Sequence, residues 1–165
     1  MLVRYLAILL ETYFAYREIG QIRQGPFVMR YQFEDDGETR RRDREPNIQV
    51  ILDSNPNTLT PTFMDGAADI VIEVVSPESV QRDYGEKLHE YERAGVPEYW
   101  IIDPIQSKAR FYHLNAEQAY VLQEVGENYE TTRLTGLKLH IPTLWKANLP
   151  KPPAIVKTVQ EMLDI

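Results

Sequence analysis

The sequence predicts a mixed α/β protein of the α+β type, in which helices pack against a β-sheet. Nearly continuous runs of β-branched residues indicate strands that are buried on both faces. Amphipathic stretches at helical spacing lie before, between and after these runs. Because helices and strands do not alternate strictly, a doubly wound fold is not expected, and helices layered on a mixed sheet fit the order of elements better.

The first half of the chain is expected to hold one helix and two strands. Leucines and aromatic residues recur near helical spacing up to Gly20, which is a typical helix stop. The turn signal Asp35-Asp36-Gly37 lies in a polar stretch that we interpret as a loop. In order, the expected elements are a helix over residues 2–18, a strand over 27–33, a polar loop over 34–46, a strand over 48–52, and a loop or short helix over 53–62.

The second half of the chain carries the clearest strand signals. One is a β-branched run interrupted by a single acid, and the other is an aromatic and aliphatic run closed by Asp103-Pro104. The expected elements are a strand over residues 68–75, a helix over 83–94, a strand over 98–102, an antiparallel pair over 109–114 and 119–124, and a last strand over 137–141. We expect one domain over residues 1–145, followed by a Pro-rich segment and short helix over 146–165.

The composition excludes several kinds of chemistry. None of the 165 residues is cysteine, which rules out disulfides, thiol nucleophiles and cysteine-ligated metal sites. The net charge of -7 argues against a strongly basic surface for indiscriminate nucleic-acid binding. The chain also lacks a glycine-rich phosphate loop and a Gly-x-Ser-x-Gly motif, which disfavours nucleotide-driven chemistry and serine hydrolysis.

No membrane or export segment is expected. The N-terminal apolar run, residues 5–10, is far shorter than the roughly 20 residues of a membrane-spanning helix. It also lacks the small-residue cleavage site of a signal peptide. We therefore expect a cytoplasmic protein that makes no membrane contact.

Glu73 is the anomalous residue, because it interrupts the apolar run Ile70–Val75. A buried, unpaired carboxylate is strongly unfavourable, so it needs a cation, a metal or strong hydrogen-bond donors. A structural partner, such as a buried arginine or backbone amides, explains the residue as well as a functional site does. The sequence alone leaves both explanations open.

Lys87 provides a candidate partner for Glu73. It lies 14 residues later, in a helix that can fold back across the end of the strand. The alternative is a solvated lysine that pairs with Asp83 or Glu90 on its own helix. Asp69 shares a strand face with Glu73, but at about 3.3 Å per residue the two lie too far apart to bind one metal. We interpret Asp69 as a strand-entry or turn residue.

Several motifs carry a resemblance to a known family. They are Pro46, Asp69–Ser79, Arg82-Asp83, Glu86-Lys87-Leu88, Tyr91-Glu92 and Ala94–Pro104. Together they resemble the Uma-two family of restriction-endonuclease-like proteins. The resemblance covers nearly the whole chain and is densest between residues 65 and 112.

The resemblance implies the PD-(D/E)XK nuclease fold, a restriction-endonuclease-like mixed sheet flanked by helices. In that superfamily two acids hold Mg²⁺ or Mn²⁺, and a lysine orients water and offsets phosphate charge. Glu73 matches one acid, and Lys87 matches the lysine, moved to the following helix. Asn47 stands where similar proteins have Asp, so the metal would be held by Glu73 and Asn47 with one carboxylate fewer. Asp69 and Tyr91 are secondary candidates.

Two functions from different classes follow. The first is a metal-dependent endonuclease that hydrolyses DNA phosphodiester bonds, impaired to some degree by Asn47. Its substrate-binding candidates are Arg40, Arg41, Arg42 and Arg44, which could contact phosphates, although a solvated loop is the simpler explanation for this run. The second is a catalytically inactive nuclease-fold module that binds DNA or a protein partner. For an enzyme that cuts both strands we expect a homodimer.

Overall fold

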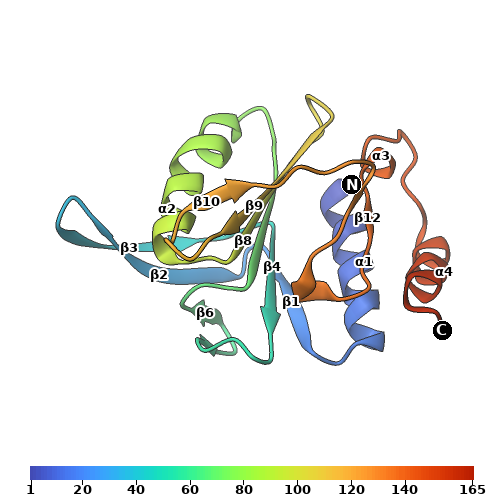
Figure 1. Ribbon diagram of the computed structural model, residues 1–165, viewed down its shortest axis with the longest axis horizontal. Helices are drawn as coiled ribbons and strands as arrows, with labels where there is room; N and C mark the ends of the chain where they lie inside the picture. Colours follow the sequence, from blue (N-terminus) through green and yellow to red (C-terminus); the bar gives the residue numbers. More distant parts are fainter. The chain divides into compact units, whose positions relative to one another are not determined.

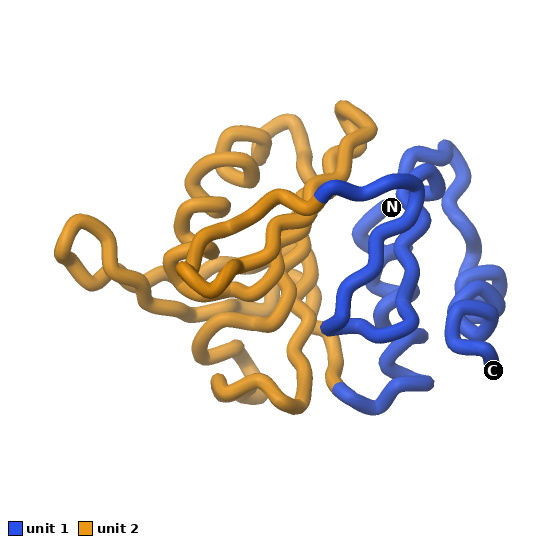
Figure 2. Tube along the Cα trace, in the orientation of Figure 1, with its two compact units in different colours: residues 1–19, 124–165 blue, residues 20–123 orange.

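The computed structural model describes all 165 residues and divides them into two compact units (Figure 2). Unit 2 is the continuous segment Gly20–Gln123. Unit 1 combines Met1–Ile19 with Glu124–Ile165. All candidate site residues lie in unit 2.

The larger sheet of unit 2 has six strands in the order β1-β4-β7-β8-β9-β10. Their bounds are β1 Gly20–Gln24, β4 Ile48–Leu52, β7 Ile70–Val74, β8 Glu98–Asp103, β9 Lys108–Leu114 and β10 Tyr120–Leu122. The central strands β7 and β8 are parallel, and every other neighbouring pair is antiparallel. The expected mixed sheet is confirmed, while β1 was not foreseen from the sequence.

A second sheet in unit 2 has the order β3-β2-β6-β5. Its strands are β2 Val28–Asp35, β3 Glu38–Arg44, β5 Thr58–Leu59 and β6 Phe63–Asp65. Strands β2 and β3 form a long hairpin whose tip projects from the unit (Figure 1). At this tip Asp36 and Gly37 both have positive φ, as a two-residue hairpin turn requires.

This hairpin corrects the expectation of a loop over residues 34–46. The charged residues of β3 form a strand that the sequence pattern did not reveal. Successive side chains of a strand point to opposite faces, so the charges of β3 are divided between the two faces. The register places Arg40, Arg42 and Arg44 beside the buried side of β2, and Arg41 on the other face. Of the loop or short helix expected over residues 53–62, the loop is what forms, with the short strand β5 within it.

The helical segment after β7 begins with a π-helical turn, Arg82–Glu86, and continues as α2, Lys87–Ala94. Gly95 ends the helix in the left-handed conformation, with φ of 80°. The apolar side of α2, including Tyr91, packs against Val71 and Tyr99 of the larger sheet and Tyr31 of the hairpin. This core fixes α2 over the face of the sheet that carries Glu73 (Figure 1).

Unit 1 contains two longer helices that pack against each other, α1 Leu2–Tyr16 and α4 Pro152–Leu163. Its other elements are β11 Asn128–Tyr129, the 3-10 turn Thr132–Leu134, β12 Leu139–His140 and α3 Ile141–Leu144. The expected N-terminal and C-terminal helices are therefore confirmed. Neither is long and apolar enough to cross a bilayer, nor is any other helix of the chain.

Candidate active site

The site is built where β4, β7 and α2 meet. Glu73 lies on β7, and the register Ile48↔Ile72 makes Asn47 its cross-strand neighbour at the start of β4. Glu73 is only 2% exposed, as its place in an apolar run predicted. Because the side chains of β7 alternate between the two faces, Glu73 points to the same side as Val71, which α2 covers.

Glu73 accepts hydrogen bonds from two side chains of α2. Its Oε1 lies 3.2 Å from the Lys87 Nζ and 3.0 Å from the Tyr91 hydroxyl. Its Oε2 has a longer contact of 3.4 Å with the Asn47 backbone N–H. Burial raises the pKa of the Glu73 carboxyl, and the Lys87 ammonium opposes this shift while the nearby Asp83 carboxylate adds to it.

The sequence posed two alternatives for Lys87, and the structure contains both contacts. Its Nζ lies 2.9 Å from Asp83 Oδ1 as well as 3.2 Å from Glu73 Oε1. Asp83, Lys87 and Tyr91 follow one another at intervals of four residues, so they form one row along the helical segment. This row faces β7 and places the ammonium between two carboxylates.

Asp83 is the site residue that sequence reasoning missed, having weighed it only as a surface partner of Lys87. It is 1% exposed, and its Oδ2 accepts a hydrogen bond of 2.5 Å from the Ser79 hydroxyl. Its backbone carbonyl, in the π-helical turn, accepts one of 2.7 Å from the Tyr99 hydroxyl. Such turns occur often at functional sites. The available signal was the four-residue spacing from Lys87, which a buried helix face would also produce.

The site carries one unbalanced negative charge when both carboxylates are ionised. Glu73 and Asp83 are two anions, and Lys87 is the one cation in contact with them. Tyr91 stays neutral, because burial and the Glu73 carboxylate raise the pKa of its hydroxyl well above its usual range. The arrangement can therefore take up a further cation.

Asn47 contributes less to cation binding than an aspartate would. Its Oδ1 accepts a hydrogen bond of 2.7 Å from the Val74 backbone N–H, so its amide nitrogen occupies the position that a second carboxylate oxygen would have. One lone pair of Oδ1 and the lightly engaged Oε2 of Glu73 remain as oxygen ligands. No group of three or more acidic or histidine side chains is arranged to hold a metal. The donor set thus fits an ion that keeps several waters, as Mg²⁺ does, better than a closed cage.

Asp69 does not join this site. It precedes β7 at the opposite end from Glu73, and its Oδ2 accepts hydrogen bonds of 2.8 Å from the Leu52 N–H and the Asn55 side-chain amide. These contacts fix the turn after β4. The structure thus gives Asp69 the contacts of a strand-entry residue.

Two of the four candidate arginines hold a second buried acid. Glu90 of α2 is 3% exposed and receives Nε of Arg42 at 3.0 Å and Nη2 of Arg44 at 2.9 Å. The Tyr31 hydroxyl donates to it at 2.9 Å, and Arg44 also pairs with Glu86 at 2.6 Å. Burial would raise the pKa of Glu90, but hydrogen bonds from Arg44, Tyr31 and Arg42 lower it below its usual value.

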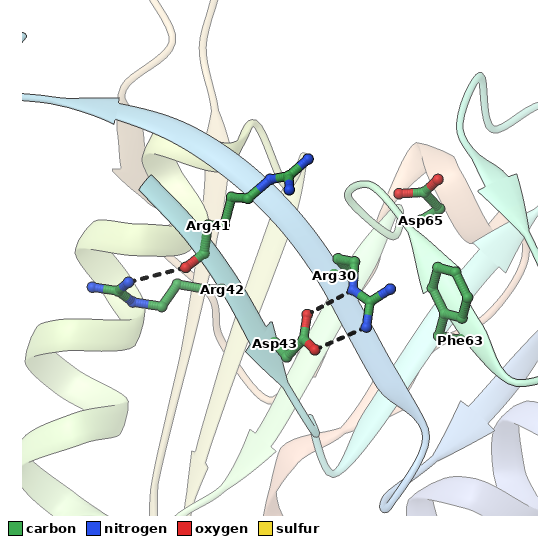
Figure 3. Close-up of a pocket in the computed structure, with 6 residues that line it drawn as sticks. All are labelled: Arg30, Arg41, Arg42, Asp43, Phe63 and Asp65. Atoms are coloured by element: carbon green, nitrogen blue, oxygen red, sulfur yellow. Dashed lines mark hydrogen bonds and ion pairs between the residues drawn. The ribbon is translucent and has the colours of Figure 1, made fainter. Parts of the chain in front are cut away.

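The other two arginines differ from each other. Arg40, near the hairpin tip, forms ion pairs with Asp35 and Glu38. Arg41 is exposed and makes no ion pair. Figure 3 shows Arg41 and Arg42 leaving β3 on opposite sides, with Arg42 directed toward α2. The run is therefore not one solvated cationic loop.

Comparisons with known proteins agree on a family and on a fold. The model of the Uma2 (Uma-two) family, described as "Putative restriction endonuclease", matches residues 2–143. The solved structure described as "a putative nuclease belonging to DUF820" from Anabaena variabilis superposes with a TM-score of 0.64 and 16% identity, covering 87% of this chain and 78% of that one. No curated protein matches significantly. Because the family model spans most of the chain, this protein belongs to the Uma2 family and shares the fold of that nuclease.

Proposed function

We propose that this protein is a metal-dependent endonuclease that hydrolyses DNA phosphodiester bonds at the Glu73–Lys87 site. The observation that supports this most is the charge of the site, where Glu73 and Asp83, both buried, share the single ammonium of Lys87. An unbalanced buried anion destabilises a fold. A site that retains one is therefore expected to bind a cation when the protein functions. Membership of the family supplies the reaction class.

Mg²⁺ or Mn²⁺ is the proposed cofactor, with Glu73 and the amide oxygen of Asn47 as its protein ligands. When bound, such an ion would polarise the phosphate and make water a better nucleophile. Magnesium sites commonly use one or two carboxylates and complete the coordination with water and substrate phosphate. We expect weak affinity without DNA, because only one of the two protein ligands is charged.

Lys87 is proposed to act as a cation rather than as a proton acceptor. Its Nζ contacts the carboxylates of Glu73 and Asp83 and acts as the positive charge between them. In contact with DNA this ammonium would donate hydrogen bonds to a phosphate oxygen and offset charge that develops on it. Asp83 and Tyr91 are positioning residues, since they hold Lys87 and Glu73 in place.

Plasmid cleavage tests the proposal. Supercoiled and single-stranded DNA are incubated with the protein in Mg²⁺, Mn²⁺ or a chelator, alongside Glu73→Gln, Lys87→Ala and Asn47→Asp. We expect metal-dependent nicking that Glu73→Gln and Lys87→Ala abolish and that Asn47→Asp increases by restoring a second charged ligand. Sedimentation of the same samples tests the expected homodimer.

The alternative is a nuclease-fold module that binds DNA or a protein without cutting. The hydrogen bond from Val74 to Asn47 favours it, because that bond uses one of the two lone pairs on the single side-chain oxygen of Asn47, where an aspartate would offer a second oxygen. If only Asn47→Asp cuts, the site assignment stands and the native chain is a disabled nuclease. If neither protein cuts under any metal, the endonuclease proposal is wrong.

A further inference from the structure

A groove lies on the hairpin sheet, on the face from which Arg30, Arg41 and Asp43 project, and one end of it reaches Ala94 at the end of α2. Its main pocket, of about 500 Å³, is bounded by β2, β3 and β6 and is lined by Arg30, Arg41, Arg42, Asp43, Phe63 and Asp65. A second pocket of about 350 Å³ shares Arg30, Arg41 and Asp65 with it and adds Gln32 and Asn57. The two pockets share three lining residues and therefore adjoin each other, and each has the volume of a small-ligand site.

The guanidinium groups of Arg30 and Arg41 in this groove differ in whether they already have an ion-pair partner. Arg30 is held by Asp43 through two hydrogen bonds of 2.9 and 3.0 Å, and its guanidinium lies 4.5 Å from the centre of the Phe63 ring. Arg41 has no such partner, and Figure 3 shows its side chain extending across β2 without a contact to the other labelled residues. The groove therefore combines a fixed, stacked cation with a free one.

These groups match the chemistry of a nucleotide unit. A free arginine binds a phosphodiester through charge-assisted hydrogen bonds. An arginine stacked on an aromatic ring presents a flat surface. Bases of single-stranded nucleic acids stack on such surfaces. The exposed Gln32 amide and Asp65 carboxylate offer hydrogen-bonding groups beside it.

We propose that this groove binds a DNA strand, with Arg41 contacting a phosphate and the Arg30–Phe63 pair supporting the adjoining nucleotide. The groove is separate from the site at Glu73, because none of Glu73, Asp83 and Lys87 lines it. Arg42 borders the groove, but its Nε is bound to Glu90. It would anchor substrate rather than react with it. The choice of DNA as the polymer rests on the proposed function.

The test measures DNA binding without cleavage. Fluorescence anisotropy of a labelled 20-nucleotide single strand is followed in chelator at several salt concentrations, with the full chain as wild type, Arg41→Ala and Arg41→Glu. Arg17→Ala, which removes the same charge from α1's C-terminal end in unit 1, is the matched control. Thermal melting of each variant verifies folding.

We expect Arg41→Ala to weaken binding about three- to tenfold and to reduce the slope of log affinity against log salt by about one. Arg41→Glu should weaken it further, and Arg17→Ala should not change it. If Arg41→Ala binds like the control, Arg41 is only a solvated residue of an edge strand and the proposal is wrong. That result would leave the proposal of cleavage at Glu73 unaffected. If binding depends on Arg41 but the protein never cuts DNA, only the endonuclease proposal is wrong.

Discussion

Unit 2 contains two buried glutamates, and their surroundings shift the two pKa values in opposite directions. Glu73 is 2% exposed and Glu90 is 3% exposed, so both have lost nearly all contact with water. The charge of Glu90 is balanced by the guanidinium groups of Arg42 and Arg44, and its pKa is lowered. Glu73 shares one ammonium with Asp83, and its pKa is raised.

The difference separates an acid with a structural role from the acid that we propose to be catalytic. Around Glu90 two arginines balance Glu86 and Glu90, which ties the hairpin to α2. When Glu73 and Asp83 are both ionised, Lys87 balances only one of them, and the deficit is one positive charge. Burial alone therefore does not single out a candidate active-site carboxylate, and the charges around it must be counted as well.

The largest effect is expected when Glu90 is removed from its cluster with Arg42 and Arg44. Glu90→Ala would leave the Tyr31 hydroxyl and Arg42 without their partner, and we expect a loss of about 3–5 kcal/mol in the free energy of unfolding. Urea denaturation followed by tryptophan fluorescence measures it. The control is Glu86→Ala, whose exposed ion pair with Arg44 should contribute less than about 1 kcal/mol. Equal losses in the two variants would contradict the structural role of Glu90.

A smaller effect is expected from Asp83→Asn, which keeps the shape of the side chain and removes the excess charge at Glu73. Lys87 loses one of its two anionic partners, so kcat should fall about tenfold, or roughly 1.4 kcal/mol, with KM for DNA nearly unchanged. The metal concentration for half-maximal rate should rise, because the site is less negative. Ser79→Ala, which removes the hydroxyl donor to Asp83 together with the acceptor of the Ser76 N–H, should have a weaker effect in the same direction.

A purely structural Asp83 would give a different pattern. Its loss would lower the melting temperature and the folded fraction, while kcat per folded molecule and the metal dependence stayed constant. Steady-state kinetics at several metal concentrations, corrected by the folded fraction, separate the two cases.

The smallest effect concerns stability and pH. Since the pKa of Glu73 is raised above the usual 4.5, the folded state binds its proton more tightly than the unfolded state does. Its contribution to stability is therefore present below the usual glutamate pKa and is lost as pH rises. Glu73→Gln should stabilise the protein by on the order of 1 kcal/mol at pH 7.

Unfolding of Glu73→Gln and wild type between pH 4.5 and 8 measures this difference. It should grow as the pH rises, because only the wild type ionises at that position. For Glu90, whose pKa is lowered, the sign is reversed, and its stabilising contribution is lost as the pH falls. A difference that stays constant with pH would mean that Glu73 is compensated as fully as Glu90.

Local residue patterns were enough to predict the elements whose signals lie within one segment. The β-branched run at β7, the aromatic run at β8 and the amphipathic row of α1 predict their own structure, because hydrophobic period and burial go together. Glu73 was recognisable for the same reason, as a charge in a segment that must be buried. Lys87 was a candidate partner because of its place in the following helix, and the resemblance to the family agreed with this; its Nζ lies 3.2 Å from Glu73 Oε1.

Only the tertiary structure decided which charges meet. Residues 38–44 become a strand by pairing with β2, and the alternation of β3 sends Arg42 to Glu90 and Arg41 to the groove on the hairpin sheet. Asp83 enters the site because the core packs its helix over β7. These pairings join residues far apart in the chain, so their energies depend on distances and burial that no local pattern of residues encodes.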